Sequence, residues 1–129
     1  MASVRRKGTL PDNARPVQGS FTGPALQYPL HEHAPSGAIR VSFVGFEAGS
    51  RTHWHKHSGG QVLHVVEGRG LTQVEGGAVE EIFEGDTVTV TPGEKHWHGA
   101  GANRAMRHLA VTIGEVEWLG PPPPLPSKP

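Results

Sequence analysis

The stretch from Gly49 to Gln61 reads Gly-Ser-Arg-Thr-His-Trp-His-Lys-His-Ser-Gly-Gly-Gln and brings three histidines and one glutamine amide into nine positions. On a β-strand, side chains two positions apart point to the same face, so His55 and His57 can direct both imidazoles at one cation. Gln61 can add an amide oxygen. We interpret this stretch as one half of a metal site that is built on strands.

A second segment, residues 91–99, reads Thr-Pro-Gly-Glu-Lys-His-Trp-His-Gly. Its His96 follows a Pro-Gly turn at the end of an apolar run, and it is the candidate for a fourth ligand. The metal ligands expected from the sequence are His55, His57, Gln61 and His96. The alternative for these four residues is a polar cluster that is held together by hydrogen bonds.

Length and charge limit the kind of protein that can hold this site. The chain has 129 residues, enough for one hydrophobic core and one domain. Twelve basic and twelve acidic residues give a formal net charge of zero, so no overall field favours nucleic acid or an anionic membrane. We expect a small neutral molecule as the substrate. Since the sequence contains no cysteine, any metal must bind through nitrogen and oxygen atoms.

Short apolar runs separated by glycine and proline predict strands through the middle of the chain. Eighteen glycines and twelve prolines supply the turns, and no stretch has the sustained apolar period of an amphipathic helix. The expected strands are residues 39–46, 61–66, 71–75, 79–83, 86–91 and 106–113. Short, evenly spaced strands are typical of all-β sandwiches and barrels, and a small barrel has room inside for side chains or one ligand.

The two ends of the chain differ in composition from the middle. Residues 1–20 are basic and poor in apolar side chains, so we expect a flexible arm. Residues 119–129 are rich in proline, and we expect an extended or disordered tail, which leaves residues 21–118 as the folded domain. No apolar stretch has the length of a signal-sequence core or a membrane-spanning helix, so we expect a cytoplasmic protein.

Residues 21–35 combine apolar side chains with three prolines, a pattern that favours an extended segment along a sheet edge. Such a segment could pair with another subunit. His31 and His33 repeat the two-residue spacing of the metal segment, but they lie between Pro29 and Pro35 without an apolar alternation. We therefore expect these two histidines in a solvated loop.

The glycines and histidines of the two segments have the spacing of the two cupin motifs. The first motif matches Gly49, His55, His57, Gln61 and Gly68, and the second matches Gly85, Gly93 and His96. The sequence departs from the usual motifs at Gln61, where most members have glutamate, in the position of Pro92, and at Ala100, where the family often has asparagine. The resemblance covers about residues 38–114. It implies a cupin-type double-stranded β-barrel, or jelly roll, with a metal near its middle.

A narrower resemblance is carried by residues 75–82, Glu-Gly-Gly-Ala-Val-Glu-Glu-Ile, together with residues 92–99 and His108. These residues are similar to those of small bacterial cupins that include the manganese-dependent hydroxynitrile lyases, which cleave a cyanohydrin to an aldehyde and cyanide or run the reverse reaction. The resemblance implies metal ligation by His55, His57, Gln61 and His96, acid-base catalysis by His108, and a substrate pocket at Ser42, Val44 and Thr112. His53, close to the expected metal, departs from this pattern.

Strand alternation places two further histidines. His98 shares the parity of His96, so it either lines the same cavity or packs beside Trp97. His108 alternates with Met106 and Ala110 and is expected to face the interior. We interpret His108 as the proton-transfer residue and His98 as a side chain that assists it or substitutes for it.

Three other polar residues are not expected to bind the metal or to take part in the reaction. His64 has the opposite parity to Gln61, so it should face away from the metal and serve packing or an interface. His53 is expected at the surface, on a loop. Arg51 is expected to support the structure or the ligands without binding the metal itself.

The expected ligand set has consequences for the chemistry. Three imidazoles and one amide are neutral, so a bound divalent ion keeps a net charge near +2 and is a stronger Lewis acid than it would be beside a glutamate. We expect one ion per chain, with manganese as the first candidate. The ligand types are also compatible with Fe, Zn, Ni, Co or Cu.

These observations predict a homodimeric, single-domain enzyme that acts as a lyase on a small neutral substrate, with hydroxynitrile lyase-like cleavage or formation of cyanohydrins. The first alternative is an iron-dependent cupin dioxygenase, which oxygen consumption would distinguish. The second alternative is a non-catalytic cupin that binds a small ligand, for which binding would saturate without turnover.

Overall fold

The computed structural model describes residues 14–17, 19–33 and 39–124, apart from the side chains of residues 32 and 33. Among these residues the regular structure is entirely β. The strands are β1 (Arg15–Pro16), β2 (Ala25–His33), β3 (Ile39–Phe46), β4 (His55–His57), β5 (Gln61–Val74), β6 (Glu80–Phe83), β7 (Thr87–Val90), β8 (His96–Ala100), β9 (Met106–Ile113) and β10 (Val116–Trp118). No helix in this part of the chain is long and apolar enough to cross a membrane.

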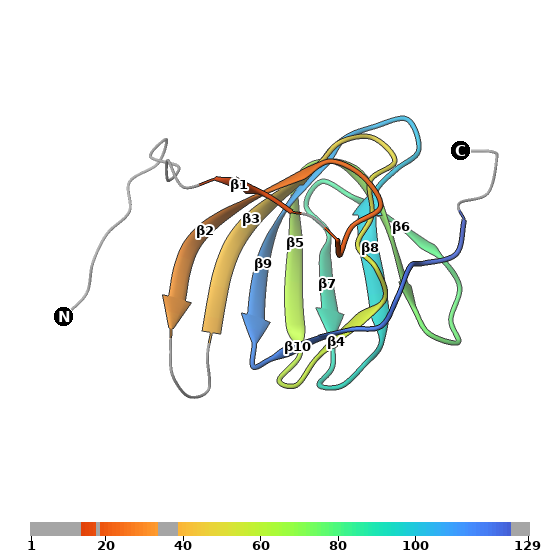
Figure 1. Ribbon diagram of the computed structural model, residues 1–129. Helices are drawn as coiled ribbons and strands as arrows, with labels where there is room; N and C mark the ends of the chain where they lie inside the picture. The colour runs from red at the N-terminus through yellow and green to blue at the C-terminus, as the bar shows by residue number, and fades with distance from the viewer. Residues whose placement is uncertain (1–13, 18, 34–38, 125–129) are drawn as a thin grey trace.

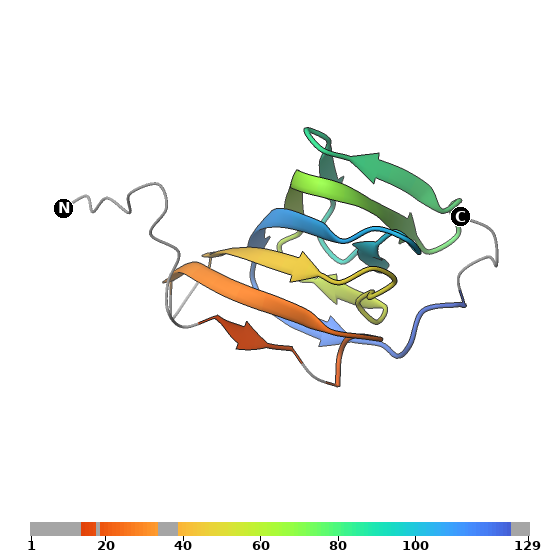
Figure 2. The ribbon, with the colours of Figure 1, turned by 90° about the horizontal axis from the view of Figure 1, so that it is seen from above.

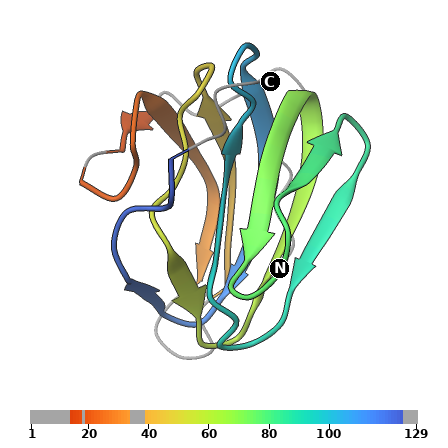
Figure 3. The same ribbon diagram turned by 90° about the vertical axis from the view of Figure 1, so that its right-hand side faces the viewer.

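All strand pairs are antiparallel, and they form one sheet in the order β1-β2-β3-β9-β5-β8-β4-β10, with β6 and β7 also paired to β5. The sheet curls (Figures 1 and 2). Residues of β2, β3 and β9 line the same interior cavity as residues of β4, β8 and β10. The two parts of the sheet therefore face each other as an all-β double-stranded barrel, as predicted (Figure 3).

Strand β5 joins the two parts of the barrel. Its first half pairs with β9 and β7, its second half pairs with β8 and β6, and the register shifts between Val65 and Glu67. Gly68, just after this irregularity, has a φ of +85°, and the carbonyl oxygen of Ala105 lies against the position that a Cβ atom would occupy. A bulge bends its strand and raises the local twist, so this region lets β5 pair with strands in both parts of the sheet.

The period-2 alternation of β3 and β9 separates an interior face from an outer face. Ser42, Val44 and Phe46 are buried on β3, and every second residue of β9 from Met106 to Thr112 is buried. The apolar core lies at one end of the barrel and contains Ala25, Val44, Phe46, Val65, Ile82, Ala100 and Met106. The interior also carries buried polar side chains, among them His55, His57, Gln61, His96, His98 and His108.

Several expected elements differ in extent from the observed ones. Residues 61–66 and 71–75, expected as two strands, belong to the single strand β5 with its bulge. The expected strands 79–83 and 86–91 are shorter in the structure, as β6 and β7. Apolar runs identify the interior of a strand better than its ends, because turns set the ends.

The prediction of a solvated loop at His31 and His33 was wrong. Both residues lie on β2, opposite Val41 and Ile39 of β3, and His31 is exposed. A register irregularity between Pro29 and His31 restores the pairing after the proline. The sequence signal failed because Pro29 interrupts the alternation without ending the strand.

The chain segments at the two ends of the domain also contact the barrel. Arg15 and Pro16, which the sequence assigned to a flexible arm, pair with β2 as β1. On the other side, the amide of Leu119 donates to the carbonyl of Trp54, and the guanidinium of Arg51 donates to the carbonyl of Pro123 over 2.7 Å. Residues 1–13 and 125–129 lie outside the described residues, and the division into arm, domain and tail stays a prediction.

Candidate metal centre

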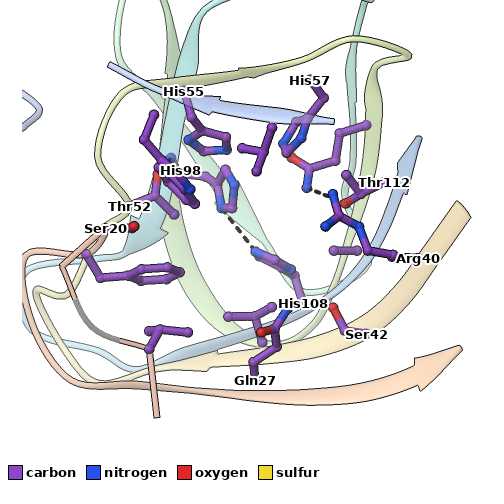
Figure 4. Close-up of a pocket in the computed structure, with 17 residues that line it drawn as sticks. Ser20, Gln27, Arg40, Ser42, Thr52, His55, His57, His98, His108 and Thr112 are labelled. Atoms are coloured by element: carbon purple, nitrogen blue, oxygen red, sulfur yellow. Dashed lines mark hydrogen bonds between the residues drawn. The ribbon is translucent and has the colours of Figure 1, made fainter. Parts of the chain in front are cut away.

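Five histidines and one glutamine meet inside the barrel. They come from four strands: His55 and His57 from β4, Gln61 from β5, His96 and His98 from β8, and His108 from β9. All six are buried, and the single residue pair between β4 and β8 is His55 opposite His96. The short strands β4 and β8 therefore bring together the two halves of the site that the sequence predicted separately (Figure 4).

Three of the histidines form the tightest group. His55, His96 and His98 can each offer one ring nitrogen such that these atoms all lie within 4.8 Å of one another. The ring centroids of His55 and His96 are 4.2 Å apart, and those of His96 and His98 are 5.4 Å apart. This group could hold a metal ion. It contains His98, which we had interpreted as a proton-transfer residue, and it does not contain His57.

The two other predicted ligands lie beside this group. The ring centroid of His57 is 4.9 Å from that of His55 and 5.6 Å from that of His96. Gln61 Nε2 donates to Thr112 Oγ1 over 2.8 Å, and Gln61 Oε1 lies 3.1 Å from His96 Nε2. Because Thr112 fixes the amide in this direction, the oxygen of Gln61 is turned toward the histidines.

The chemistry of these side chains fits a divalent ion. Both ring nitrogens of His57, Nε2 of His98 and Nδ1 of His108 are buried without a hydrogen-bond partner. A buried polar atom without a partner costs about 1–3 kcal/mol, and a bound ion would satisfy the nitrogens within its reach. Neutral nitrogen and oxygen donors suit Mn, Fe, Co, Ni, Cu and Zn alike, so the donor set does not select one metal.

Backbone carbonyls orient two of the rings. His55 Nδ1 lies 2.8 Å from the carbonyl oxygen of His53, and His96 Nδ1 lies 3.2 Å from that of Glu94. A carbonyl only accepts, so Nδ1 of His55 carries the proton and leaves its Nε2 as the lone pair for an ion. His96 faces an acceptor at each nitrogen, the carbonyl oxygen of Glu94 and Gln61 Oε1, and its neutral ring can donate to only one of them. His53 thus contributes its backbone oxygen, while its side chain is not among the residues that line the cavity.

Burial keeps the histidines neutral. Desolvation, followed by the charge of His96, lowers the pKa of His55 to about 3 and that of His57 to about 4. Desolvation also lowers the pKa of His108 to about 4 and lowers the pKa values of His96 and His98. Neutral imidazole is the form that ligates a metal, so at neutral pH the rings are ready to bind.

His98 and His108 form a pair at the inner end of the cluster. His108 Nε2 and His98 Nδ1 are 3.1 Å apart, and the ring of Phe46 packs against both imidazoles at centroid distances of 5.3 and 5.9 Å. His108 is fully buried. The structure therefore places both predicted proton-transfer residues in the cavity, while their catalytic roles stay predictions.

A cavity of about 290 Å³ opens beside the histidines. Ser42, Val44 and Thr112, expected to line a substrate pocket, all line it, as does Ala110. An apolar wall consists of Val17, Phe21, Val44, Val116 and Trp118. The ring centroid of Trp118 lies 4.6 Å from that of His55 and 6.2 Å from that of Phe21, so β10 covers β4. This volume suits a small ligand.

The sequence analysis missed eight residues that line the cavity, namely Val17, Ser20, Phe21, Gln27, Arg40, Thr52, Val116 and Trp118. Arg40 and Gln27 line the cavity from β3 and β2, and Phe21 and Trp118 line it from segments near the two ends of the domain. Alternation with Ser42 would have placed Arg40 on the interior face. Phe21 and Trp118 lie outside the strongly patterned strands, so no period identifies them.

Two residues set aside by the sequence analysis behave as expected. His64 is exposed, and its Nδ1 lies 2.9 Å from Thr87 Oγ1 on the outer face. The guanidinium of Arg51 stacks over the ring of Trp97 at 4.9 Å and is buried. Neither side chain lines the cavity.

An antiparallel barrel that encloses a cluster of neutral histidines beside a small cavity defines a class of protein, the small β-barrel proteins whose interior could hold a metal. Residues 42–112 match the family model of the cupin domain. The chain belongs to the cupin family, as the spacing of its two motifs predicts.

Relatives of known name or structure agree with this assignment. The chain is 45% identical over 120 residues to an (R)-mandelonitrile lyase of Granulicella tundricola, a match that covers 90% of this chain and 91% of the relative. It is similar to the crystal structure of a cupin-like protein from Thermotoga maritima, with a TM-score of 0.77 and 35% identity over 81% of this chain and 83% of that one. A cupin 2 conserved barrel domain protein from Rhodopseudomonas palustris, at 19% identity and a TM-score of 0.66 over 91% of this chain and 80% of that one, shares the fold.

Proposed function

We propose that this cupin is a metal-dependent lyase that cleaves or forms small cyanohydrins, with manganese as the first candidate ion. The observation that carries the proposal is the buried pair of His98 and His108, 3.1 Å apart, directly beside the histidine cluster and inside a small cavity. The relative named as a mandelonitrile lyase supports the same chemistry by its 45% identity over nearly the whole chain.

The residues that would hold the ion are His55, His57, Gln61 and His96, with His98 as a further nitrogen within reach. When bound, the ion supplies Lewis acidity to an oxygen atom of the substrate. His55 and His96 are oriented for this by the carbonyls of His53 and Glu94. Thr112 orients the amide of Gln61.

His108 accepts the hydroxyl proton of the cyanohydrin in this proposal. The C–C bond to the nitrile carbon breaks, its electron pair leaves on cyanide, and the remaining O–C bond becomes the carbonyl of the aldehyde. The proton on His108 then passes to cyanide, so that hydrogen cyanide and aldehyde are the products. Burial lowers the pKa of His108 to about 4, which keeps the ring neutral and able to accept at neutral pH.

The apolar wall selects the organic part of the substrate. Phe21, Val44 and Trp118 offer aromatic and aliphatic surface at one side of the cavity, and its volume of about 290 Å³ limits the size of the ligand. A small aromatic or aliphatic aldehyde fits this description. The apolar wall also reduces the access of water to the proton-transfer pair.

The test is turnover of mandelonitrile by preparations that are loaded separately with manganese, iron and zinc, with and without oxygen. We expect aldehyde release that follows metal content and is independent of oxygen. His55→Ala, checked by circular dichroism for an intact fold, is the control for loss of the metal. Oxygen consumption that follows iron content would instead establish a dioxygenase, and saturable binding without turnover would establish a binding protein.

The protein is also proposed to be a homodimer. The outer face of the sheet carries exposed apolar side chains at Ile39, Val62, Val66 and Ile113, between 37% and 41% exposed. An apolar face of this kind favours association, for which a second copy is the simplest partner. Light scattering of the wild type and of Val62→Glu tests this: we expect a dimer for the first and a smaller species for the second.

A further inference from the structure

Arg40 is the one arginine or lysine among the described residues that line the cavity. It lies on β3 with the same parity as Ser42 and Val44, opposite Thr112 of β9 in the strand register. Its Nη2 donates to the carbonyl of Gly114 over 3.2 Å. The guanidinium therefore extends along the wall toward the end of the cavity that contains His57 and Thr112 (Figure 4).

The guanidinium of Arg40 lies on the same side of the cavity as His57. Both residues line this cavity, so the charge of Arg40 faces the end of the histidine cluster that contains His57 (Figure 4). No aspartate or glutamate is among the described residues that line the cavity. With neutral ligands, a divalent ion and Arg40 would give this small space a strongly positive potential.

A cation in this position is unfavourable for metal binding, because like charges repel in a partly buried site. Support of the carbonyl of Gly114 needs only one hydrogen-bond donor, which the amide of a glutamine could supply without a charge. A guanidinium presents a planar fork of donors that matches carboxylates and other small anions. The arrangement is therefore better explained by an anionic group that binds between Arg40 and the metal centre.

We propose that Arg40, with the hydroxyls of Ser42 and Thr112 beside it, forms a binding site for a monoanionic group in the cavity. The anion is either a carboxylate carried by the substrate or the cyanide that leaves it, since both carry one negative charge and accept hydrogen bonds from a guanidinium. The choice between these two anions rests on the proposed lyase function. Binding of a simple anion at Arg40 does not require lyase activity.

The first experiment measures binding of formate and benzoate to the metal-free protein by isothermal titration calorimetry. We expect saturable binding to the wild type and an affinity about 10- to 100-fold lower for Arg40→Gln, since a charge-assisted hydrogen bond is lost. Arg40→Lys should keep part of the affinity. The control is Arg104→Gln, which removes the same charge from an exposed residue that does not line the cavity.

Equal affinities of the wild type and Arg40→Gln for both anions would overturn the anion site. If Arg40→Gln fails to fold, the charge-retaining Arg40→Lys variant still tests it, with Arg104→Gln as its control. In that case, benzoate affinity must fall in Arg40→Lys and must not fall in Arg104→Gln. Any other pattern in these two variants would contradict the proposal.

The second experiment identifies the anion by steady-state kinetics with mandelonitrile and with a ring-carboxylated mandelonitrile. A higher KM of Arg40→Gln for the carboxylated substrate alone would assign the site to a substrate carboxylate. A lower kcat of the same variant for both substrates would assign it to departing cyanide. Anion binding at Arg40 in a wild type that turns over neither substrate would defeat the lyase proposal and leave the anion site standing.

Discussion

His98 Nδ1 and His108 Nε2 lie 3.1 Å apart, and this single contact couples the protonation of the two rings. A hydrogen bond between neutral imidazoles needs one N–H and one lone pair. If His108 donates, its Nδ1 is a base and His98 Nε2 carries a proton, so His98 cannot ligate an ion. If His98 donates, its Nε2 is free for an ion and His108 Nδ1 carries a proton. Metal ligation by His98 and base catalysis by His108 are therefore mutually exclusive.

The first prediction follows for His108. His108→Gln should keep the fold and the metal and lower kcat for mandelonitrile by about 10²–10⁴-fold, the usual contribution of a positioned acid-base group. The measurement is kcat at equal metal occupancy between pH 5 and 8. His64→Gln, which changes an exposed histidine on the outer face, should be unaffected. A near-wild-type rate for His108→Gln would shift the role to His98.

The second prediction separates the two possible ligand sets. We expect His55→Ala, His57→Ala and His96→Ala to lose metal, and His98→Ala to retain it. The measurement is metal content after dialysis, together with the affinity for manganese. Retention of metal by His57→Ala and its loss from His98→Ala would instead favour the group of His55, His96 and His98, whose nitrogens lie within 4.8 Å of one another.

The third prediction concerns the charge of the ligand set. Gln61→Glu places a charged oxygen where the amide oxygen lies 3.1 Å from His96 Nε2. Metal affinity should persist or increase, while the rate should fall because the ion becomes a weaker Lewis acid. Metal titration tests the predicted affinity, and kcat measured on the same preparation tests the predicted rate. A variant that binds metal no better and reacts faster would contradict this account of the neutral site.

The fourth prediction is a loss of stability of the metal-free protein in acid. The folded-state pKa of His108 is about 4 and its ordinary value is 6.5, so between these values the unfolded chain binds more protons. Stability is then highest above pH 6.5 and decreases as pH falls toward 4, by roughly 3 kcal/mol from His108. Urea unfolding at several pH values measures it. His108→Gln should show a flatter dependence, and an equal slope would contradict this assignment.

The fifth prediction compares two glycines with the same backbone conformation. Gly68 and Gly76 have φ values of +85° and +86°, but a Cβ atom at Gly68 would meet the carbonyl of Ala105, whereas none of the atoms around Gly76 lies within 4 Å. Gly76→Ala should cost about 1–2 kcal/mol for the left-handed conformation alone. Gly68→Ala should cost about 1–3 kcal/mol more, through the clash. Chemical denaturation measures both, and equal losses would show that β5 can shift.

Much of the fold is predictable because its signals are local. The His-x-His spacing of His55 and His57, the turn before His96 and the alternation around His108 each depend on a few neighbouring residues. Local rules do not show how these separate segments come together, whereas the spacing of the two cupin motifs predicts that they share one barrel. In the structure these residues lie in one interior cluster.

The remaining features depend on contacts between distant segments. The direction of Arg40 follows from strand parity, but its position beside His57 follows from the curl of the sheet. Trp118 reaches His55 only because β10 pairs with β4. The proximity of His98 to His55 is likewise a property of the closed barrel, whereas its proximity to His96 follows from the alternation along β8.

The pairing of β10 with β4 has a consequence for biosynthesis. Strand β4 carries His55 and His57 but pairs with β8 at one residue position, whereas β10 pairs with all three of its residues. During translation, residues 116–118 leave the ribosome well after the histidines of β4. The nascent chain therefore cannot complete the pairing of β4 until β10 has been made, so binding of the proposed ion should follow synthesis of the barrel.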